Sequence, residues 1–252
     1  REEYGLDDAD VFEQRQTQTV FGAGLIDGIP DAVILANEDP DDEDEDGVRG
    51  VARMIETKVG VELGRFGWKA QMPRLADFAR DAMGAECGIT TPIDGRGFAL
   101  AEDADGVQDP ELSQQDLDDL VFFMTHLAPP APGGSTSPLR AEGETLFDTV
   151  GCVKCHVPSL DGADGQPVRL FSDLLLHRIM PDDFRGMSEP GAPAGVYRTA
   201  PLWGNRDRAP YLHDGGAETV DEAIRNHFGE ADFARLNYLG LTDAEREALL
   251  HF

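Results

Sequence analysis

Cysteine and basic residues are both scarce in this chain. Its 252 residues include three cysteines, too few for the disulfide frameworks that stabilise small secreted domains. The 21 lysines and arginines are outnumbered by 49 aspartates and glutamates, so the formal net charge is −28. Because phosphate backbones are bound by Lys and Arg, we expect no nucleic-acid partner. The acidic balance fits either a solvated surface or a basic partner protein.

Long hydrophobic runs are also missing. No stretch approaches the ~20 consecutive apolar residues that span a bilayer, so we expect no membrane span. The opening residues, 1–4, contain neither an initiator Met nor a signal peptide, and we expect a chain that was processed or cut from a longer one. The length suits one large domain or two of ordinary size.

Glycine and proline are frequent, at 28 and 16 residues, and predict long loops. Apolar spacing and capping signals predict helices over 20–26, 31–36, 73–83, 114–127 and 140–150, and two short closing helices behind Thr219 and Thr242. Segment 51–67 alternates loosely and predicts strands or an extended arm. Segment 128–138 is a Pro- and Gly-rich linker, which divides the chain into domains over 1–127 and 139–252. The expected fold is mainly α with long loops.

The segment Cys152-Val153-Lys154-Cys155-His156 is a complete c-type haem attachment motif. In such a motif two cysteines form thioether bonds to the haem and the histidine binds its iron. The alternative is a redox CxxC or half of a zinc site, but zinc would need another Cys pair or a nearby His pair, which the sequence lacks. We therefore expect haem c bound to Cys152, Cys155 and His156. Covalent attachment needs an export-side maturation system, so we expect a periplasmic location.

The sixth ligand of the iron decides between electron transfer and catalysis. An open position binds peroxide or oxygen, whereas a closed one passes electrons. The candidate ligands are His126, His177, Met180, Met187, His213, His227 and His251. His227 is the best placed, because it shares a helical face with Ala223 and Ile224 behind a strong cap. The alternative for His227 is a packed histidine with no ligand role.

Three further segments follow the haem motif in a fixed order: RTAPLWG at 198–204, YLHDGG at 211–216 and ETVDEAI at 218–224. Together they resemble the C-terminal haem domain of the bacterial di-haem cytochrome c peroxidases. A closer resemblance is to the branch called di-haem oxidoreductases, or "thiol oxidoreductases". That branch also has segments like VFGAGLIDGIP at 20–30, GRFGWKA at 64–70 and SDLLLH at 172–177. The resemblance covers almost the whole chain, with a cytochrome-c-like haem domain at its C-terminus.

The resemblance implies roles for several residues. In the peroxidases the sixth ligand, usually a Met, lies fourteen positions after the histidine of the HDG segment, and here that position is His227. A bis-histidine pair of His156 and His227 has a lower potential than a His/Met pair. His213 would lie near the interface of two haem domains with a propionate or backbone partner. Trp68 would be either a bridging aromatic or a core residue, and Arg65 either a propionate partner or a surface residue.

The resemblance also implies a second haem. One CxxCH is present here, so we expect the other upstream, and residues 1–127 would be the rest of a peroxidatic-type domain without its haem motif. The chain would be the C-terminal part of a periplasmic, peroxidase-like di-haem oxidoreductase. Its haem would relay electrons from a redox partner protein to the upstream haem. A pure electron-transfer cytochrome without its own substrate is the alternative, and this chain alone need not be an active enzyme.

The acidic run at 39–46 contains the start of a D-x-D-x-D-G calcium loop, with Asp42, Asp44 and Asp46 followed by Gly47. The twelfth position of such a loop is Arg53, where a bidentate Glu belongs. An extended acidic loop without an ion is therefore the alternative to calcium.

The third cysteine, Cys87, has no resolving partner outside the haem motif. Because a thiol-disulfide relay needs two cysteines, we expect Cys87 to be a small buried residue.

Overall fold

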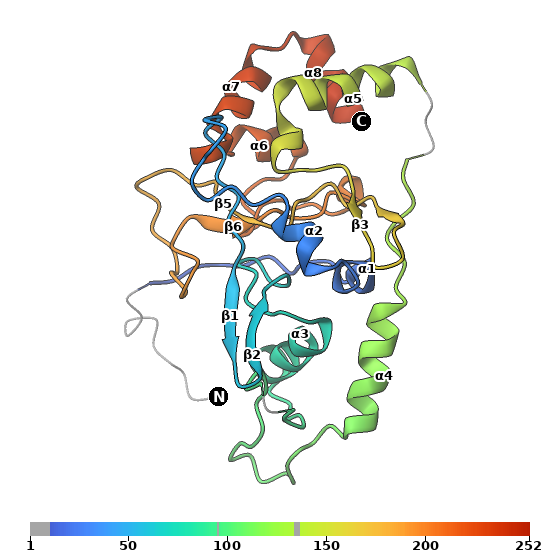
Figure 1. The fold of residues 1–252 in the computed structure, drawn as a ribbon, viewed down its shortest axis with the longest axis vertical. Coiled ribbons are helices and arrows are strands. Elements are labelled where there is room, and N and C mark those ends of the chain that lie inside the picture. The colour runs from blue at the N-terminus through green and yellow to red at the C-terminus, as the bar shows by residue number, and fades with distance from the viewer. Residues whose placement is uncertain (1–10, 95, 134–136) are drawn as a thin grey trace.

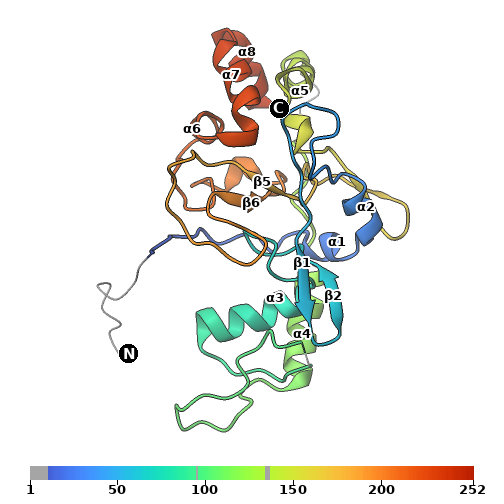
Figure 2. The same ribbon diagram turned by 60° about the vertical axis from the view of Figure 1, so that its left-hand side comes forward.

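The computed structural model describes residues 11–94, 96–133 and 137–252. The expectations for residues 1–4, and for 134–136 in the linker, fall outside these ranges. Figure 1 shows three tiers along the long axis of the molecule, and Figure 2 shows them from a second side. The fold combines helices, small sheets and long loops, so the predicted helical, loop-rich class is confirmed in its coarse form. None of the described helices is long and apolar enough to cross a membrane.

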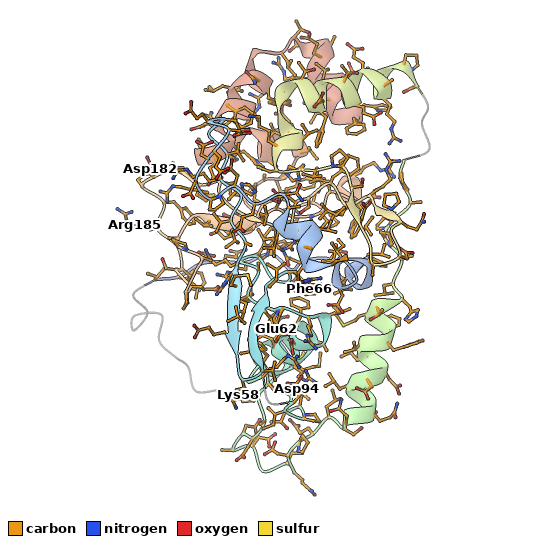
Figure 3. All side chains as sticks on the ribbon, in the orientation of Figure 1. Lys58, Glu62, Phe66, Asp94, Asp182 and Arg185 are labelled. Atoms are coloured by element: carbon orange, nitrogen blue, oxygen red, sulfur yellow. The ribbon has the colours of Figure 1, made fainter. Side chains whose placement is uncertain are left out.

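The lowest tier in Figure 1 holds a hairpin and two helices. These are β1 (Met54–Thr57), β2 (Gly60–Leu63), α3 (Leu75–Ala82) and α4 (Gln114–Thr125). The strands pair antiparallel within the segment that predicts strands. α4 begins where predicted, because the Ser113 side chain accepts a hydrogen bond from the Asp116 N–H at 3.2 Å. Figure 3 labels Glu62 and Asp94, two carboxylates that form ion pairs with Arg96 in this tier.

The end of α3 corrects one prediction. The helix continues into a π-helical turn, η2 (Met83–Cys87), which ends at Gly88 in the left-handed conformation. Cys87 is exposed there as a free thiol and is not the buried residue that we expected. A turn at the surface gives its last side chain no core to enter.

The middle tier contains short elements within the kind of long loops that the glycine and proline content predicts. They are α1 (Ala23–Asp27), α2 (Asp31–Leu35), β3 (Leu160–Asp161), β4 (Pro167–Val168), β5 (Leu176–Arg178), β6 (Val196–Arg198) and the 3₁₀ turn η4 (Asn205–Asp207). β3 pairs with β4 and β5 with β6, both antiparallel. Strands of two or three residues carry no alternation, so they could not be predicted from the sequence.

The upper tier packs α5 (Pro138–Val150), α6 (Val220–Arg225), α7 (Asp232–Gly240) and α8 (Asp243–His251), with a 3₁₀ turn η5 (Gly229–Ala231) before α7. α5 and α8 approach closely, since a Cβ on Gly143 would lie 2.1 Å from the Ala248 carbonyl oxygen. Both predicted capping boxes are present, at Thr219 and Thr242. α7 was not predicted, because Ala231 at its N-cap provides no capping side chain.

The largest core crosses the predicted linker. Leu117 and Met124, from the first half of the chain, share one apolar cluster with Leu170, Leu175 and Trp203 from the second half. A smaller cluster joins α5, α7 and α8 in the upper tier. The division at 128–138 stays a prediction, and the two halves of the chain are packed together across it.

Candidate functional site

The haem motif follows directly on the C-terminus of α5. Gly151 ends that helix in the left-handed conformation with φ 101°, and a Cβ there would lie 2.3 Å from Cε2 of Phe233. Only glycine suits both the φ and the close contact. The chain then makes one 3₁₀ turn, η3 (Cys152–Lys154), and the His156 N–H donates to the Cys152 carbonyl at 2.9 Å. This turn places Cys152, Cys155 and His156 in the wall of one cavity.

The cavity has a volume of about 1000 Å³ and extends between the upper helices and the middle tier. His227, which follows α6, lines it together with the three motif residues. Its apolar walls come from the upper core: Phe147, Phe171, Leu202, Ile224, Ala234, Leu249 and Phe252. Ligand cavities run to roughly 1,000 Å³, so this space suits a large, mostly apolar cofactor.

The His156 imidazole is held as a neutral metal ligand would be. Its Nδ1 lies 2.9 Å from the Phe171 carbonyl oxygen. A carbonyl only accepts, so Nδ1 carries the proton and Nε2 keeps its lone pair. Burial lowers the pKa of His156 to about 4, although the bond to Phe171 opposes this, and the neighbouring His227 lowers it further. The ring is therefore neutral at neutral pH.

The His227 imidazole repeats this arrangement. Its Nδ1 donates to the Ala223 carbonyl at 2.6 Å, which again leaves the Nε2 lone pair free among the described residues. Burial lowers the pKa of His227. The capping box of Thr219 and Glu222 anchors the helix that carries it. Two neutral imidazoles with free Nε2 atoms in one cavity fit the axial pair of a haem iron.

The two motif cysteines are free thiols. Burial raises the pKa of Cys152 to about 12 and also raises the pKa of Cys155. Both thiols line one apolar cavity together with His156. They fit thioether attachment, and the residues present therefore suit a covalently bound haem.

His177 has both nitrogens engaged by carboxylates. Its Nε2 lies 2.8 Å from an Asp173 oxygen, and its Nδ1 lies 3.0 Å from Glu230 and 3.6 Å from the Cys155 sulfur. Burial alone would lower the pKa of His177, but the bonds to Asp173, Cys155 and Glu230 raise it well above its usual value. With both ring nitrogens hydrogen-bonded to carboxylates, His177 has no free lone pair for the haem iron. It supports the chain beside Cys155.

His213 and Trp68 lie together at another edge of the cavity. The His213 ring stacks on Tyr197 at 4.0 Å between centroids and meets the Trp68 ring edge-on at 6.5 Å. Among the described residues neither ring nitrogen of His213 has a hydrogen-bond partner, and burial lowers its pKa. The Trp68 indole N–H donates to the Gln16 carbonyl at 2.6 Å. The structure thus brings these two predicted residues together, and their contact with haem stays a prediction.

Arg65 does not lie where the resemblance suggested. Its Nη1 donates to the carbonyls of Asp27 at 3.2 Å and Ile29 at 2.7 Å, and its Nη2 pairs with Asp31. It is buried and is not part of the cavity wall. This guanidinium holds the loop between α1 and α2, so we do not carry Arg65 forward as a propionate partner.

The acidic run is arranged differently from the predicted calcium loop. Carboxylate oxygens of Asp39, Asp42 and Asp44 lie within 4.8 Å of one another. Asp46 is not in that group, because its side chain pairs with Lys154 of the haem motif at 2.5 Å. The ion pair with Lys154 therefore keeps Asp46 apart from Asp42 and Asp44, and the predicted calcium site gains no support.

The other candidate iron ligands differ in whether they line the cavity. Met180, Met187 and His126 are not in the cavity wall, whereas the exposed His251 lies at its rim. Sequence reasoning missed Asp173 and Glu230, since carboxylates that hold a buried histidine have no signature spacing. It also gave no role to the arginines of segment 198–208, although that segment opens with the quoted RTAPLWG motif.

Comparison with known proteins gives one family. The family described as "Di-haem oxidoreductase, putative peroxidase" matches residues 4–252. No curated protein matches the chain. Among solved structures, hydrazine synthase of Kuenenia stuttgartiensis, pressurised with 20 bar xenon, is similar at 16% identity with a TM-score of 0.42. That match covers 100% of this chain and 98% of the other. The chain therefore belongs to the di-haem oxidoreductase family.

Proposed function

We propose that this chain binds haem c through thioethers at Cys152 and Cys155, with His156 and His227 as the axial ligands. One observation carries the proposal. The two histidines line one cavity with the motif cysteines, and each donates its Nδ1 proton to a backbone carbonyl. Both Nε2 lone pairs are thereby available to a metal.

The residues of the cavity have three tasks in this proposal. The Phe171 and Ala223 carbonyls fix the orientation and tautomer of the two imidazoles. The apolar walls exclude water, which lowers the local dielectric and favours a low-charge centre. The ion pair of Lys154 with Asp46 ties the motif turn to the acidic loop. Bound there, haem supplies reversible one-electron transfer.

We assign the chain to a periplasmic di-haem oxidoreductase with peroxidase-like chemistry, in which this haem relays electrons towards a second, upstream haem. The family description names two haems and a peroxidase, and the sequence contains one attachment motif. In this assignment residues 139–252 form the relay domain and residues 1–127 belong to the peroxidatic domain. The net charge of −28 favours a basic redox partner protein as the electron source.

A pure electron-transfer cytochrome is the second candidate. It is favoured by the same two histidines, since a filled sixth position leaves this iron no site for peroxide. Addition of peroxide to the protein containing both haems separates the two candidates. Turnover supports the oxidoreductase, and its absence supports the cytochrome.

The haem ligation itself is tested by optical spectra of the chain matured with an export-side haem attachment system. We expect a six-coordinate, low-spin spectrum without the thioether-to-iron charge-transfer band in the near infrared. His227→Ala should become high-spin, while His126→Ala, outside the cavity wall, should stay low-spin. A thioether band in the wild type, or an unchanged His227→Ala spectrum, would contradict the assignment.

A further inference from the structure

Segment 198–208 brings basic donors without acid partners to the cavity. Arg198 is 5% exposed, and its Nε and Nη1 each donate at 3.1 Å to the backbone carbonyls of Gly67 and Thr199. Within the described residues no carboxylate lies at ion-pair distance from it. Burial lowers the pKa of Arg198 to about 10, although the more distant Asp173 opposes this. A guanidinium so placed lacks the anion that usually accompanies a buried charge.

Two further hydrogen-bond donors of the same segment also lack an acid partner. The Trp203 indole is 8% exposed, lines the cavity, and its Nε1 has no acceptor in the described part of the chain. The ring is fixed by close packing, since a Cβ on Gly22 would lie 2.4 Å from Cζ2 of Trp203. Arg208 also lines the cavity and is partly buried, which lowers its pKa. It makes no ion pair with any described residue.

These donors stand out because acid partners are abundant elsewhere. Acidic residues outnumber basic ones by 49 to 21, and the buried Arg53 and Arg80 and the half-buried Arg96 each pair with a carboxylate. The remaining arginines of the cavity wall are engaged or exposed: Arg140 and Arg235 have partners, and Arg169 and Arg206 are exposed. The missing acceptor at this end of the cavity is therefore a carboxylate that residues 11–94, 96–133 and 137–252 do not supply.

We propose that Arg198, Trp203 and Arg208 bind the propionate carboxylates of the haem. The inference rests on the proposed function and adds the orientation of the cofactor to it. Haem has two propionates, and the segment offers two cations and an indole N–H. Charge-assisted hydrogen bonds from guanidinium to carboxylate are the strong pairs that such a setting favours.

The test uses the haem-loaded chain and measures the midpoint potential as a function of pH. A cation beside the haem favours the ferrous state, so Arg198→Met and Arg208→Gln should each lower the potential at neutral pH. Loss of the cation should also raise the propionate pKa by about one unit or more, a tenfold or larger rise in proton affinity. Arg198→Lys should recover much of the shift, and Trp203→Phe should move the propionate pKa in the same direction.

Arg185→Gln is the matched control, because this exposed arginine lies on the molecular surface outside the cavity wall (Figure 3). It should leave the potential and its pH dependence unchanged. The inference is overturned if Arg208→Gln and Arg198→Met both match this control while the spectrum stays low-spin. That result would leave the haem ligation intact. A wild-type chain that takes up no haem would overturn the proposed function and the inference together.

Discussion

Gly151 sets the direction in which the haem motif leaves α5. Replacement by Ala combines left-handed strain with a contact of 2.3 Å to Phe233, so we expect Gly151→Ala to destabilise the fold by about 2–4 kcal/mol. Gly165 also has a positive φ, 72°, but open space around it, so Gly165→Ala should cost only about 1–2 kcal/mol. Urea unfolding of both variants measures the difference. Equal losses would mean that the contact with Phe233 is not important.

Also at the residue scale, the ionisation of His177 makes the free energy of unfolding depend on pH. Its folded pKa lies well above the unfolded value, because the bonds to Asp173, Cys155 and Glu230 outweigh burial. The stabilisation is therefore complete below about pH 6.5, the unfolded pKa, and is lost as pH rises through the folded pKa. We expect the loss of unfolding free energy in His177→Gln to be larger at about pH 5.5 than well above the folded pKa.

The matched control for that measurement is His126→Gln, since His126 is exposed and bonded only to its own helix. Its effect should be small at both pH values. A His177→Gln effect that does not change with pH would mean that the ring contributes by packing and not by charge.

At the scale of elements, the capping box of α6 controls the histidine that ends it. Thr219→Ala should cost about 1 kcal/mol of stability, as should Thr242→Ala in the equivalent box of α8. Because His227 follows α6, Thr219→Ala alone should raise the high-spin fraction of the haem-loaded chain on mild warming. Spectra and unfolding curves of both variants separate ligation from stability. An equal spectral change in Thr242→Ala would contradict the link to α6.

The elements also show which sequence signals were sufficient. α4, α6 and α8 were predicted because a capping residue and an apolar face coincide within one short segment. β5 and β6 were not, because three residues each are held by pairing with distant segments, as in the bridge of Val51 with Leu176. Long-range pairing leaves no local pattern.

The residues of the candidate site likewise differ in whether a local sequence pattern predicts them. The contiguous CxxCH motif predicted Cys152, Cys155 and His156. His227 was predicted from its place on a helical face and from the spacing that the resemblance supplied. The contacts of the Arg65 side chain with the segment around the end of α1 could not be predicted from its motif, because three backbone carbonyls and Asp31 provide them. The carboxylates around His177 come from segments more than fifty residues apart.

At the scale of the whole molecule, one core spans the predicted linker, and the cavity is closed by residues from both sides of it. Trp68 and Gln16 of the first half meet His213 of the second beside the cavity. Haem binding and the packing of the two halves should therefore be coupled. A ligand that binds only the folded chain stabilises all parts that unfold with it.

The central claim is that haem is attached covalently at Cys152 and Cys155. The most direct test is the mass of the denatured chain after maturation with an export-side attachment system, alongside the chain carrying Cys152→Ala and Cys155→Ala together. The account predicts a wild-type mass raised by one haem that survives denaturation, and no such increase in the double variant. A wild-type chain without haem, or with haem that leaves on denaturation, would contradict the account.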